Sequence, residues 1–595
     1  MARPFPSVSR CSCLLSAVFV AAPFLVPLPV WSQVGAAAAP EAWKLLPPKP
    51  LAYVVAPAPG ELLEYVLKHP LRARVEALPG YRAAVDSEGY RKFQGAVALA
   101  QTQLGRRWPA AIEGLVGGGV HLAFDAKQQS ACLLARAAEP EFAAQTEQQL
   151  LNWANFAAKQ NATPWKSSEH RGVTIHQGPD GACLAVWDGW IAFSNRLTTV
   201  KSVVDRSRDG GESLADHPTL ASLHRQTTPA TRLWAHVDLK QLRDAGAAKQ
   251  LFQGQAENPA AELLFGGVLT TLQHTDFLAA RLEAAPEGVK LSVAAPHRDQ
   301  WVPEPRRHFF GADSRGQGKL LAQVNDQILS LTAYREIGRM WMQADDLFSP
   351  KMVDSLTEAD SNLTTLFGGR DFGEDILGSL KPQVQFVVGR QAFEQLPRPA
   401  LRLPGFALVG LLRDPVKMQP DLRRTYQSLI GFLNIVGAQQ GNPQLDMDIE
   451  AVGDAKLYTA NYVPEPTEAK SETARIFFNF SPCIAFAGER VVISSSVELA
   501  KKLIQSPANG AETPNTLATL SAVAARKALE DNRGQLIAQN MLEGNTRKDA
   551  ERTIDSILDV ADMLRSVELS LSTSPADAVS KLELTLEVEF APANE

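Results

Sequence analysis

Short runs in which apolar and polar residues alternate occur along most of the chain, and the runs come in adjacent pairs. Residues 581–590 show this most clearly, because Leu582, Leu584, Leu586 and Val588 alternate with Glu and Thr. Such a strand can place one face on a core and the other in water. Stretches with helical spacing lie between the pairs. This order predicts an α+β fold, in which helices pack on mostly antiparallel sheet that has one solvated face.

The pattern occurs twice. Residues 183–195 align without a gap with residues 483–495, and each copy predicts a strand, a tight turn and a second strand. Asp188-Gly189 favours a two-residue turn in which both positions have positive φ, and Gly488-Glu489 favours a turn with glycine first. An amphipathic helix is expected after each hairpin. The chain therefore contains an internal duplication.

The correspondence continues before each hairpin. Residues 131–136 form a predicted strand that is followed by Pro140 and a helix, and residues 406–413 are likewise followed by Pro415 and a helix. Proline can begin a helix because the first helical position needs no backbone N–H donor. The match on this side supports one repeated unit.

Toward the two ends of the repeated unit, the two copies are matched only through short strand and helix patterns. The strand 51–55 and its following helix are matched with a strand at 320–324 and a helix at 328–342. After the hairpins, the strand 233–239 is matched with 536–542. Two tandem copies of the same α+β unit are therefore expected.

Four regions follow from this arrangement. Residues 1–39 are expected to be a signal peptide, 40–297 the first repeat domain, 298–317 a linker and 318–595 the second repeat domain. The first part of the linker, residues 298–307, is rich in proline and charged residues, which favours a short exposed connection.

The N-terminus has the order of a secretory signal. Arg3 and Arg10 precede an apolar run at 14–30, and small residues follow at 35–39. Cleavage is expected near residues 37–39, and the alternative is an uncleaved anchor, because the run approaches the length of a bilayer span. The protein is expected to be exported to the periplasm or cell envelope, with secretion also open.

Composition narrows the function classes. The 595 residues carry a formal net charge of -6, and 45% of them are hydrophobic. This balance argues against a nucleic-acid-binding surface spread over the whole protein, and disorder, collagen and coiled coil fit the composition poorly. Three cysteines remain after the signal, too few for a disulfide framework, and all lie in apolar, strand-like runs: Cys132, Cys183 and Cys483. They are interpreted as small buried hydrophobic residues rather than redox or nucleophilic groups.

No motif assigns chemistry to the chain. There is no HExxH, CxxC or GxSxG sequence, and residues 311–319 fail the spacing of a phosphate-binding loop. All ten histidines lie at or before His308, and scattered structural histidines are favoured over a metal site. If a site exists, His170, His176 and His236 are the residues to test. No catalytic, metal-binding or cofactor-binding residue is assigned, and no cofactor is expected.

Two features could contact a partner. The second copy has a long polar loop at 463–473 where the first has only residues 177–181, and such a loop is either a tolerated insertion or a contact element. Arg306 and Arg307, beside two phenylalanines, could touch an acidic partner, although two charges are weak evidence.

The chain resembles a broad family of exported bacterial proteins that is known only as a domain of unknown function. The resemblance depends on the opening strand 51–55 after a proline-rich lead, the Asp188-Gly189 hairpin that ends at 194–195, and the strand end 237–239. It implies an envelope or secreted location and supplies no activity or catalytic residues.

Three functions stay open. The leading hypothesis is a non-enzymatic, exported two-repeat protein with a binding or scaffolding role in the cell envelope. The first alternative is a periplasmic carrier that holds an apolar ligand between sheet and helices. The second is a hydrolase with an unrecognised site around His170, His176 and His236. The expected partner is an unknown envelope protein or an apolar ligand, without nucleic acid, and membrane contact is expected only through an uncleaved N-terminal segment.

Overall fold

The computed structural model describes residues 41–157, 165–252, 255–312, 315–393, 398–464, 473–507, 510–574 and 580–592. The predicted signal peptide and most of the polar loop 463–473 lie outside these residues. The chain divides into two compact units: Met1–Trp234 with Glu283–Pro286, and Ala235–Leu282 with Glu287–Glu595. The expected repeat boundaries stay a prediction, because a compact unit is defined by contacts and a repeat by sequence.

The first unit contains an antiparallel sheet whose pairing order is β4-β5-β6-β7-β3-β2-β1. The bounds are β1 (Ala52–Ala56), β2 (Val120–Asp125), β3 (Ser130–Arg136), β4 (Lys166–His170), β5 (Val173–Gln177), β6 (Cys183–Trp187) and β7 (Trp190–Ser194). Two buried clusters occupy its two faces. Helix α8 (Leu197–Asp209) packs on one face, and α6 (Trp108–Val116) and α7 (Pro140–Ala157) pack on the other. The described part of this unit is thus a sheet between two helical layers.

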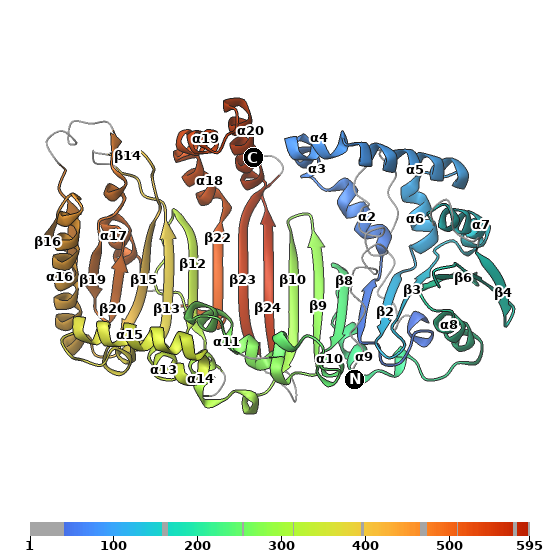
Figure 1. The fold of residues 1–595 in the computed structure, drawn as a ribbon, viewed down its shortest axis with the longest axis horizontal. Helices are drawn as coiled ribbons and strands as arrows, with labels where there is room; N and C mark the ends of the chain where they lie inside the picture. The colour runs from blue at the N-terminus through green and yellow to red at the C-terminus, as the bar shows by residue number, and fades with distance from the viewer. Residues whose placement is uncertain are drawn as a thin grey trace. The chain divides into compact units, whose positions relative to one another are not determined.

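The second unit contains a longer antiparallel sheet, in the order β10-β24-β23-β22-β12-β13-β15-β20-β19-β17-β16 (Figure 1). The bounds are β10 (Gly288–His297), β12 (Gln327–Tyr334), β13 (Leu380–Gly389), β15 (Gly405–Leu412), β16 (Leu445–Val452), β17 (Ala455–Tyr462), β19 (Cys483–Ala487), β20 (Arg490–Ser494), β22 (Thr516–Ser521), β23 (Leu564–Ser574) and β24 (Ser580–Phe590). Strands β8 (Thr231–Asp238) and β9 (Phe277–Ala285) each contribute residues to both units.

The remaining helices precede, follow or connect these strands. In the first unit they are α2 (Pro59–Lys68), α3 (Arg72–Ala77), α4 (Pro79–Val85), α5 (Glu88–Leu104) and α9 (Pro218–His224). In the second they are α10 (Leu239–Asp244), α11 (Pro259–His274), α12 (Arg307–Phe310), α13 (Ile337–Met342), α14 (Ala344–Leu347), α15 (Pro350–Leu366), α16 (Pro415–Gln439), α17 (Val497–Gln505), α18 (Ala522–Asp531), α19 (Arg533–Leu542) and α20 (Arg547–Asp562). Two short strand pairs lie outside the large sheets: β11 (Gly318–Lys319) with β21 (Glu512–Thr513), and β14 (Arg398–Pro399) with β18 (Thr473–Ala474).

The strand connectivity confirms two tandem copies of an α+β unit. Numbered along the chain, the seven strands of the first sheet pair in the order 4-5-6-7-3-2-1. The strands from β12 to β20 in the second unit, which are β12, β13, β15, β16, β17, β19 and β20, pair in the same order. An unrelated pair of sheets would have to reproduce every one of these neighbours by chance. Strand β10 then pairs with β24, the last strand of the second copy.

The hairpins form as their sequences predict. Asp188 and Gly189 have φ values of 44° and 78°, the two positive values that a type I′ turn needs. Gly488 has a φ of 59° and Glu489 is not among the residues with positive φ, which fits the turn with glycine first. Both predicted turns are confirmed, because the type of a two-residue turn depends mainly on the two residues within it.

Two of the sequence matches were wrong. The first strand of the second copy is β12 at Gln327–Tyr334, so the strand expected at 320–324 and the helix start expected at 328 are displaced. Residues 536–542 lie in helix α19, and the first strand of the large sheet after the second hairpin helix is β22. Ile537 packs in a buried cluster with apolar residues of α20, which favours helix over strand. Tertiary packing decided these two short segments.

The expectation of an exposed connector at 298–307 fits residues 298–300, Pro303 and Glu304, which are exposed, but Val302 and Arg306 within it are buried. The segment that follows it, from His308 to Phe310, is buried as well. Phe309 and Phe310 pack with Leu571 and Leu582 of the sheet. The segment is part of the core because its two aromatic rings cover one end of β23 and β24.

None of the helices in the described parts of the chain is both long enough and apolar enough to cross a membrane.

Candidate functional site

A row of apolar side chains crosses one face of the second sheet. Each member lies directly opposite the next in the strand register, so all of them project from the same face. From β20 to β10 they are Ile493, Leu408, Phe386, Leu331, Ala518, Leu569, Leu586 and Leu291. The row therefore spans eight neighbouring strands without a polar member.

A second row lies two residues further along the same strands. From β15 to β10 its members are Phe406, Val388, Leu329, Leu520, Val567, Val588 and Val289. The rings of Phe386 and Phe406 approach to 6.5 Å between centroids across the two rows. We call the two rows together the apolar strip.

The apolar strip is open to solvent. Six of its side chains are between 37% and 55% exposed, and they are Leu291, Phe406, Leu408, Ile493, Leu520 and Leu586. The other nine are partly exposed, and none of the fifteen belongs to a buried cluster. With roughly 200 Å² for each large apolar side chain, the six alone expose on the order of 500 Å². This area is in the range of the largest apolar patches of monomers, which are often functional.

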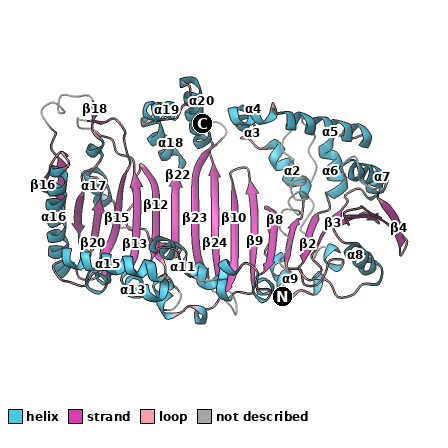
Figure 2. Cartoon of the chain, viewed as in Figure 1, coloured by secondary structure: helices cyan, strands magenta, loops and turns pink. Residues whose placement is uncertain are grey.

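Helices border the strip on one side. Three of the next residues along the same face, Ala333, Val491 and Leu571, are buried. Leu571 packs against Phe309 and Phe310, with Val268 of α11 beside them. Figure 2 shows α11, α13 and α15 along one end of these strands. The strip is the part of the apolar face that these helices leave uncovered.

The opposite face of the sheet differs along its length. Behind β13, β15 and β20, Val387, Val409 and Val492 are buried under α17. Behind β23, β24 and β10 the side chains are polar, and Lys290 pairs with Glu587 at 3.7 Å. Burial, followed by the nearby charges of Glu587 and Glu589, raises the pKa of Glu568 on this acidic face.

Sequence reasoning assigned the faces correctly and the environment of one face wrongly. The alternation in β24 placed Leu582, Leu584, Leu586 and Val588 on one face, as observed. Leu582 is buried and Leu584 packs against the same cluster, so the expected core position was wrong only for Leu586 and Val588. A signal existed in β15, where residues 406–409 are all apolar although only one face is covered. Continuous apolar runs predict strands with both faces covered, which here would require an additional apolar partner.

A buried ion cluster ties the connecting segment to both neighbouring elements. Arg306 donates to the two carboxylate oxygens of Glu262 on α11 at 2.9 and 3.0 Å, and both residues are almost fully buried. His308 Nε2 lies 3.8 Å from the same carboxylate. Arg307 instead pairs with Asp299 at 2.6 Å. The two arginines considered for an acidic partner therefore both have partners within the chain.

Arg335 lies close to this cluster and is also buried. Its guanidinium donates to Asn515 Oδ1 at 2.8 Å and to Thr516 Oγ1 at 2.6 Å, and it stacks 3.6 Å from the ring centroid of Phe309. Burial lowers the pKa of Arg335 to about 9, and the charge of Glu262 opposes that shift. The cluster stabilises the contact between α11, α12 and the sheet rather than presenting groups to a substrate.

The three histidines singled out from the sequence have separate environments. His170 Nε2 lies 2.8 Å from Asp205, and His176 lies 2.8 Å from Ser167 and 3.2 Å from Glu147. His236 stacks on Phe277 in the second unit. Among the described residues, no group of three or more His, Cys, Asp or Glu side chains could hold a metal ion.

The cysteines are buried, as predicted. Cys132, Cys183 and Cys483 are free thiols in the cores of the two sheets. Burial raises the pKa of Cys132 and Cys483 to about 12 and that of Cys183 to about 11. A thiol with such a pKa is a poor nucleophile at neutral pH.

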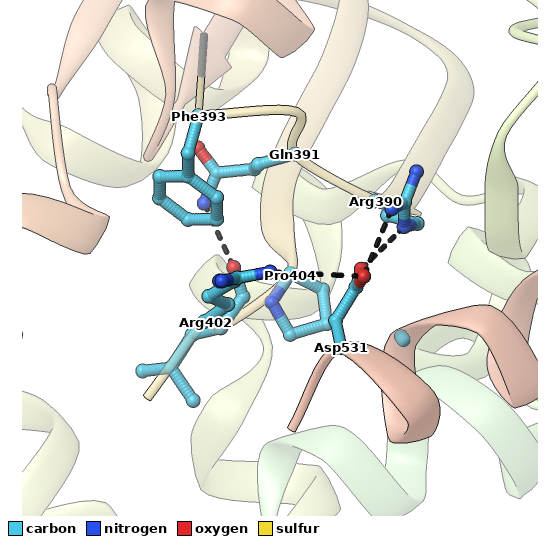
Figure 3. A pocket seen from close by; sticks show the side chains of 8 residues that line it. Arg390, Gln391, Phe393, Arg402, Pro404 and Asp531 are labelled. Atoms are coloured by element: carbon cyan, nitrogen blue, oxygen red, sulfur yellow. Dashed lines mark hydrogen bonds and ion pairs between the residues drawn. The ribbon is translucent and has the colours of Figure 1, made fainter. Parts of the chain in front are cut away.

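Two small hollows lie on the second unit. One, of about 10 Å³, is lined by Arg390, Gln391, Arg402 and Asp531 (Figure 3). Arg390 donates to both carboxylate oxygens of Asp531 at 2.5 and 3.0 Å, so the charges there already satisfy one another. The other, of about 140 Å³, lies between α16 and strands β16 and β17. Both are smaller than the roughly 300 Å³ at which ligand pockets begin.

Comparisons with known proteins place the chain in no family. No family model matches it, and no curated protein matches it. Among solved structures, crystal forms I, III and IV of a protein called TP0453 match with a TM-score of 0.25 in each case. The sequence identities are 7%, 11% and 9%, and the matches cover 43–44% of this chain and 80–82% of the other. At such values the likeness carries no conclusion about fold or activity, so function is argued from the site.

Proposed function

We propose that the protein is a non-enzymatic, exported binding protein and that the apolar strip is its binding surface. The carrying observation is that fifteen apolar side chains lie in register on one sheet face and stay open to solvent. Exposed apolar area has an unfavourable free energy in water, and covering it with an apolar partner recovers about 25 cal/mol for each Å². The proposed envelope location depends on the order of charged, apolar and small residues at the N-terminus.

The other two hypotheses have less support. A carrier that encloses its ligand needs a cavity, and the hollow of about 140 Å³ beside α16 is too small for a typical ligand. A hydrolase around His170, His176 and His236 needs these side chains to converge. Each of them instead contacts a different neighbour.

The proposal is tested with a fluorescent apolar probe, 8-anilinonaphthalene-1-sulfonate. We expect the native protein to enhance its fluorescence and Leu408→Glu to remove at least half of that enhancement, because a charge then stands in the first row. The matched control is Leu542→Glu on α19, which changes a side chain that is even more exposed, at 83% against 55%. Near-UV circular dichroism checks that both variants keep the native packing.

The proposal fails if both variants reduce the probe signal equally, or if the native protein gives no enhancement. Equal loss would mean that exposed apolar residues anywhere on the surface bind the probe. A selective loss in Leu408→Glu would locate the binding surface on the strip.

A further inference from the structure

We propose that β16, the edge strand of the second sheet, binds an extended segment of a partner polypeptide as an added antiparallel strand. The segment carries apolar and basic side chains in alternation. This inference goes beyond the proposed function, because it concerns β16 and α16 rather than the apolar strip. It follows from the backbone groups, the side chains and the charges at this edge.

Strand β16 ends the second sheet (Figure 1). Among the described residues it pairs only with β17. The corresponding edge strand of the first copy, β4, has five residues and no apolar side chain. Short polar edges discourage the addition of a further strand. Strand β16 is longer, with eight residues, and apolar side chains alternate with acidic ones along most of it.

The backbone groups of alternate residues in 445–451 point away from β17. Val463, directly after β17, donates its N–H to the carbonyl of Gln444 at 2.9 Å, so the groups of the next residue, Leu445, point outward. Leu445 donates its N–H to Oδ1 of Asn434 at 2.7 Å and accepts from Nδ2 of the same amide at 2.8 Å. The amide of Asn434 thus bonds the start of the edge as a neighbouring strand would.

The side chain of Asp448 occupies another of the outward donors. Its carboxylate accepts the N–H of Ile449 at 2.7 Å. A carbonyl of an added strand can take over that N–H, because both groups of Ile449 lie on the open side of β16. The carboxylate is then free to pair with a basic side chain of the incoming segment.

One face of β16 fits apolar side chains. Met447 and Ile449 lie opposite Ala460 and Tyr458 of β17, which pack in the cluster with α16. Their own side chains are 46% and 62% exposed. The hollow of about 140 Å³ beside α16 is lined in part by these two side chains and Tyr458. An apolar cavity of roughly 150 Å³ holds benzene, so the hollow has room for one apolar side chain of the added strand.

The other face of β16 is acidic. Asp446 and Asp448 are exposed there, and Glu450 pairs with Lys501 of α17 at 2.5 Å. Opposite charges on facing strands stabilise the pair, and like charges destabilise it. An antiparallel second copy of β16 would place its carboxylates against those of the first. The charges therefore disfavour self-pairing and favour a basic segment.

The test measures the fluorescence anisotropy of a labelled peptide, acetyl-Gly-Lys-Val-Lys-Val-Lys-Val-Gly-amide, mixed with the purified protein. We expect saturable binding. Met447→Pro should weaken it about tenfold or more, because an outward N–H is lost, whereas pairing with β17 should persist because proline is tolerated at such edge positions. Met447→Ala, the matched control for the side chain, should bind more tightly than Met447→Pro does.

A second pair of variants tests the charges. Asp446→Asn/Asp448→Asn should weaken peptide binding about threefold or more, because two cross-strand charge pairs are lost. Asp345→Asn/Asp346→Asn changes two exposed carboxylates of α14 and alters the net charge equally, so it should bind as the native protein does.

Methylated peptides test the backbone bonds without any change in the protein. Only alternate amides of an antiparallel strand face its neighbour, and here those of the valines face β16. N-methylation of the three valine amides should abolish binding, and N-methylation of the three lysine amides should preserve it.

The inference is overturned if the parent peptide does not bind, if Met447→Pro binds it as the native protein does, or if both methylated peptides bind equally. Equal losses in the two asparagine double variants would mean general charge attraction and also overturn it. A protein dimer that Met447→Pro dissociates would assign the edge to a second copy instead. The apolar probe and Leu408→Glu test the strip separately, so each proposal can fail without the other.

Discussion

Removal of the carboxylate of Glu262 should destabilise the second unit strongly. The side chain is fully buried and accepts two hydrogen bonds from Arg306 at 2.9 and 3.0 Å. Glu262→Gln keeps the volume but leaves the guanidinium of Arg306 buried without a counter-charge. Breaking a buried ion pair from one side costs about 3–5 kcal/mol. The nearby charge of Arg335 adds to the cost, because Glu262 is the group that favours its protonated form.

The assay is equilibrium unfolding in urea, followed by far-UV circular dichroism. Glu304→Gln is the control, since Glu304 is an exposed partner of Arg339 and a surface pair contributes at most about 1 kcal/mol. The double variant Glu262→Leu/Arg306→Met should recover part of the loss, because it removes the paired charges of Glu262 and Arg306 while Arg335 stays buried without Glu262. The reasoning is refuted if Glu262→Gln loses no more free energy of unfolding than Glu304→Gln does.

Three further outcomes are expected. Burial, and to a lesser extent the charge of His224, lowers the pKa of His121 to about 4. The unfolded chain therefore binds the proton more readily than the folded chain does. The free energy of unfolding should fall by roughly 3 kcal/mol for this group as the pH drops from 6.5 to 4. His121→Gln should flatten that part of the stability–pH curve, and an unchanged curve would contradict the assignment. Gly189→Ala should cost about 1–2 kcal/mol in urea unfolding because φ is 78° there, whereas Gly80→Ala, with open space and no positive φ, should cost nothing measurable. The three buried thiols are those of Cys132, Cys183 and Cys483. They should resist Ellman's reagent in the native protein at pH 8 and react fully in urea. Rapid labelling of the native protein would show that at least one thiol is accessible.

Much of the fold could be predicted from the sequence where the signal was local. The Asp188-Gly189 turn, the paired strands around it and the following helix need only nearby residues, and all of them form in the structure. The duplication was detectable for the same reason, because residues 183–195 and 483–495 carry the same local pattern.

The errors fell where a pattern was short and its partner distant in sequence. Residues 536–542 have an apolar content that suits either element, and contact with α20 makes them a helix. The connector at 298–317 begins with a stretch that is rich in proline and charged residues, which is typical of an exposed segment. Arg306 is nevertheless buried, because Glu262, 44 residues away in the sequence, provides its counter-charge.

For the apolar strip, too, some properties follow from the sequence alone and others only from the tertiary structure. The sequence by itself determined which residues share a sheet face, since alternation with period two leaves no choice once a strand forms. It also excluded catalytic motifs by their spacing. Only the tertiary structure decided that one apolar face is half covered, because the helices that cover it, α11 and α12, reach the sheet through long-range packing of Val268, Phe309 and Phe310. Whether an apolar side chain is core or surface depends on which distant element lies over it, and no local pattern carries that information.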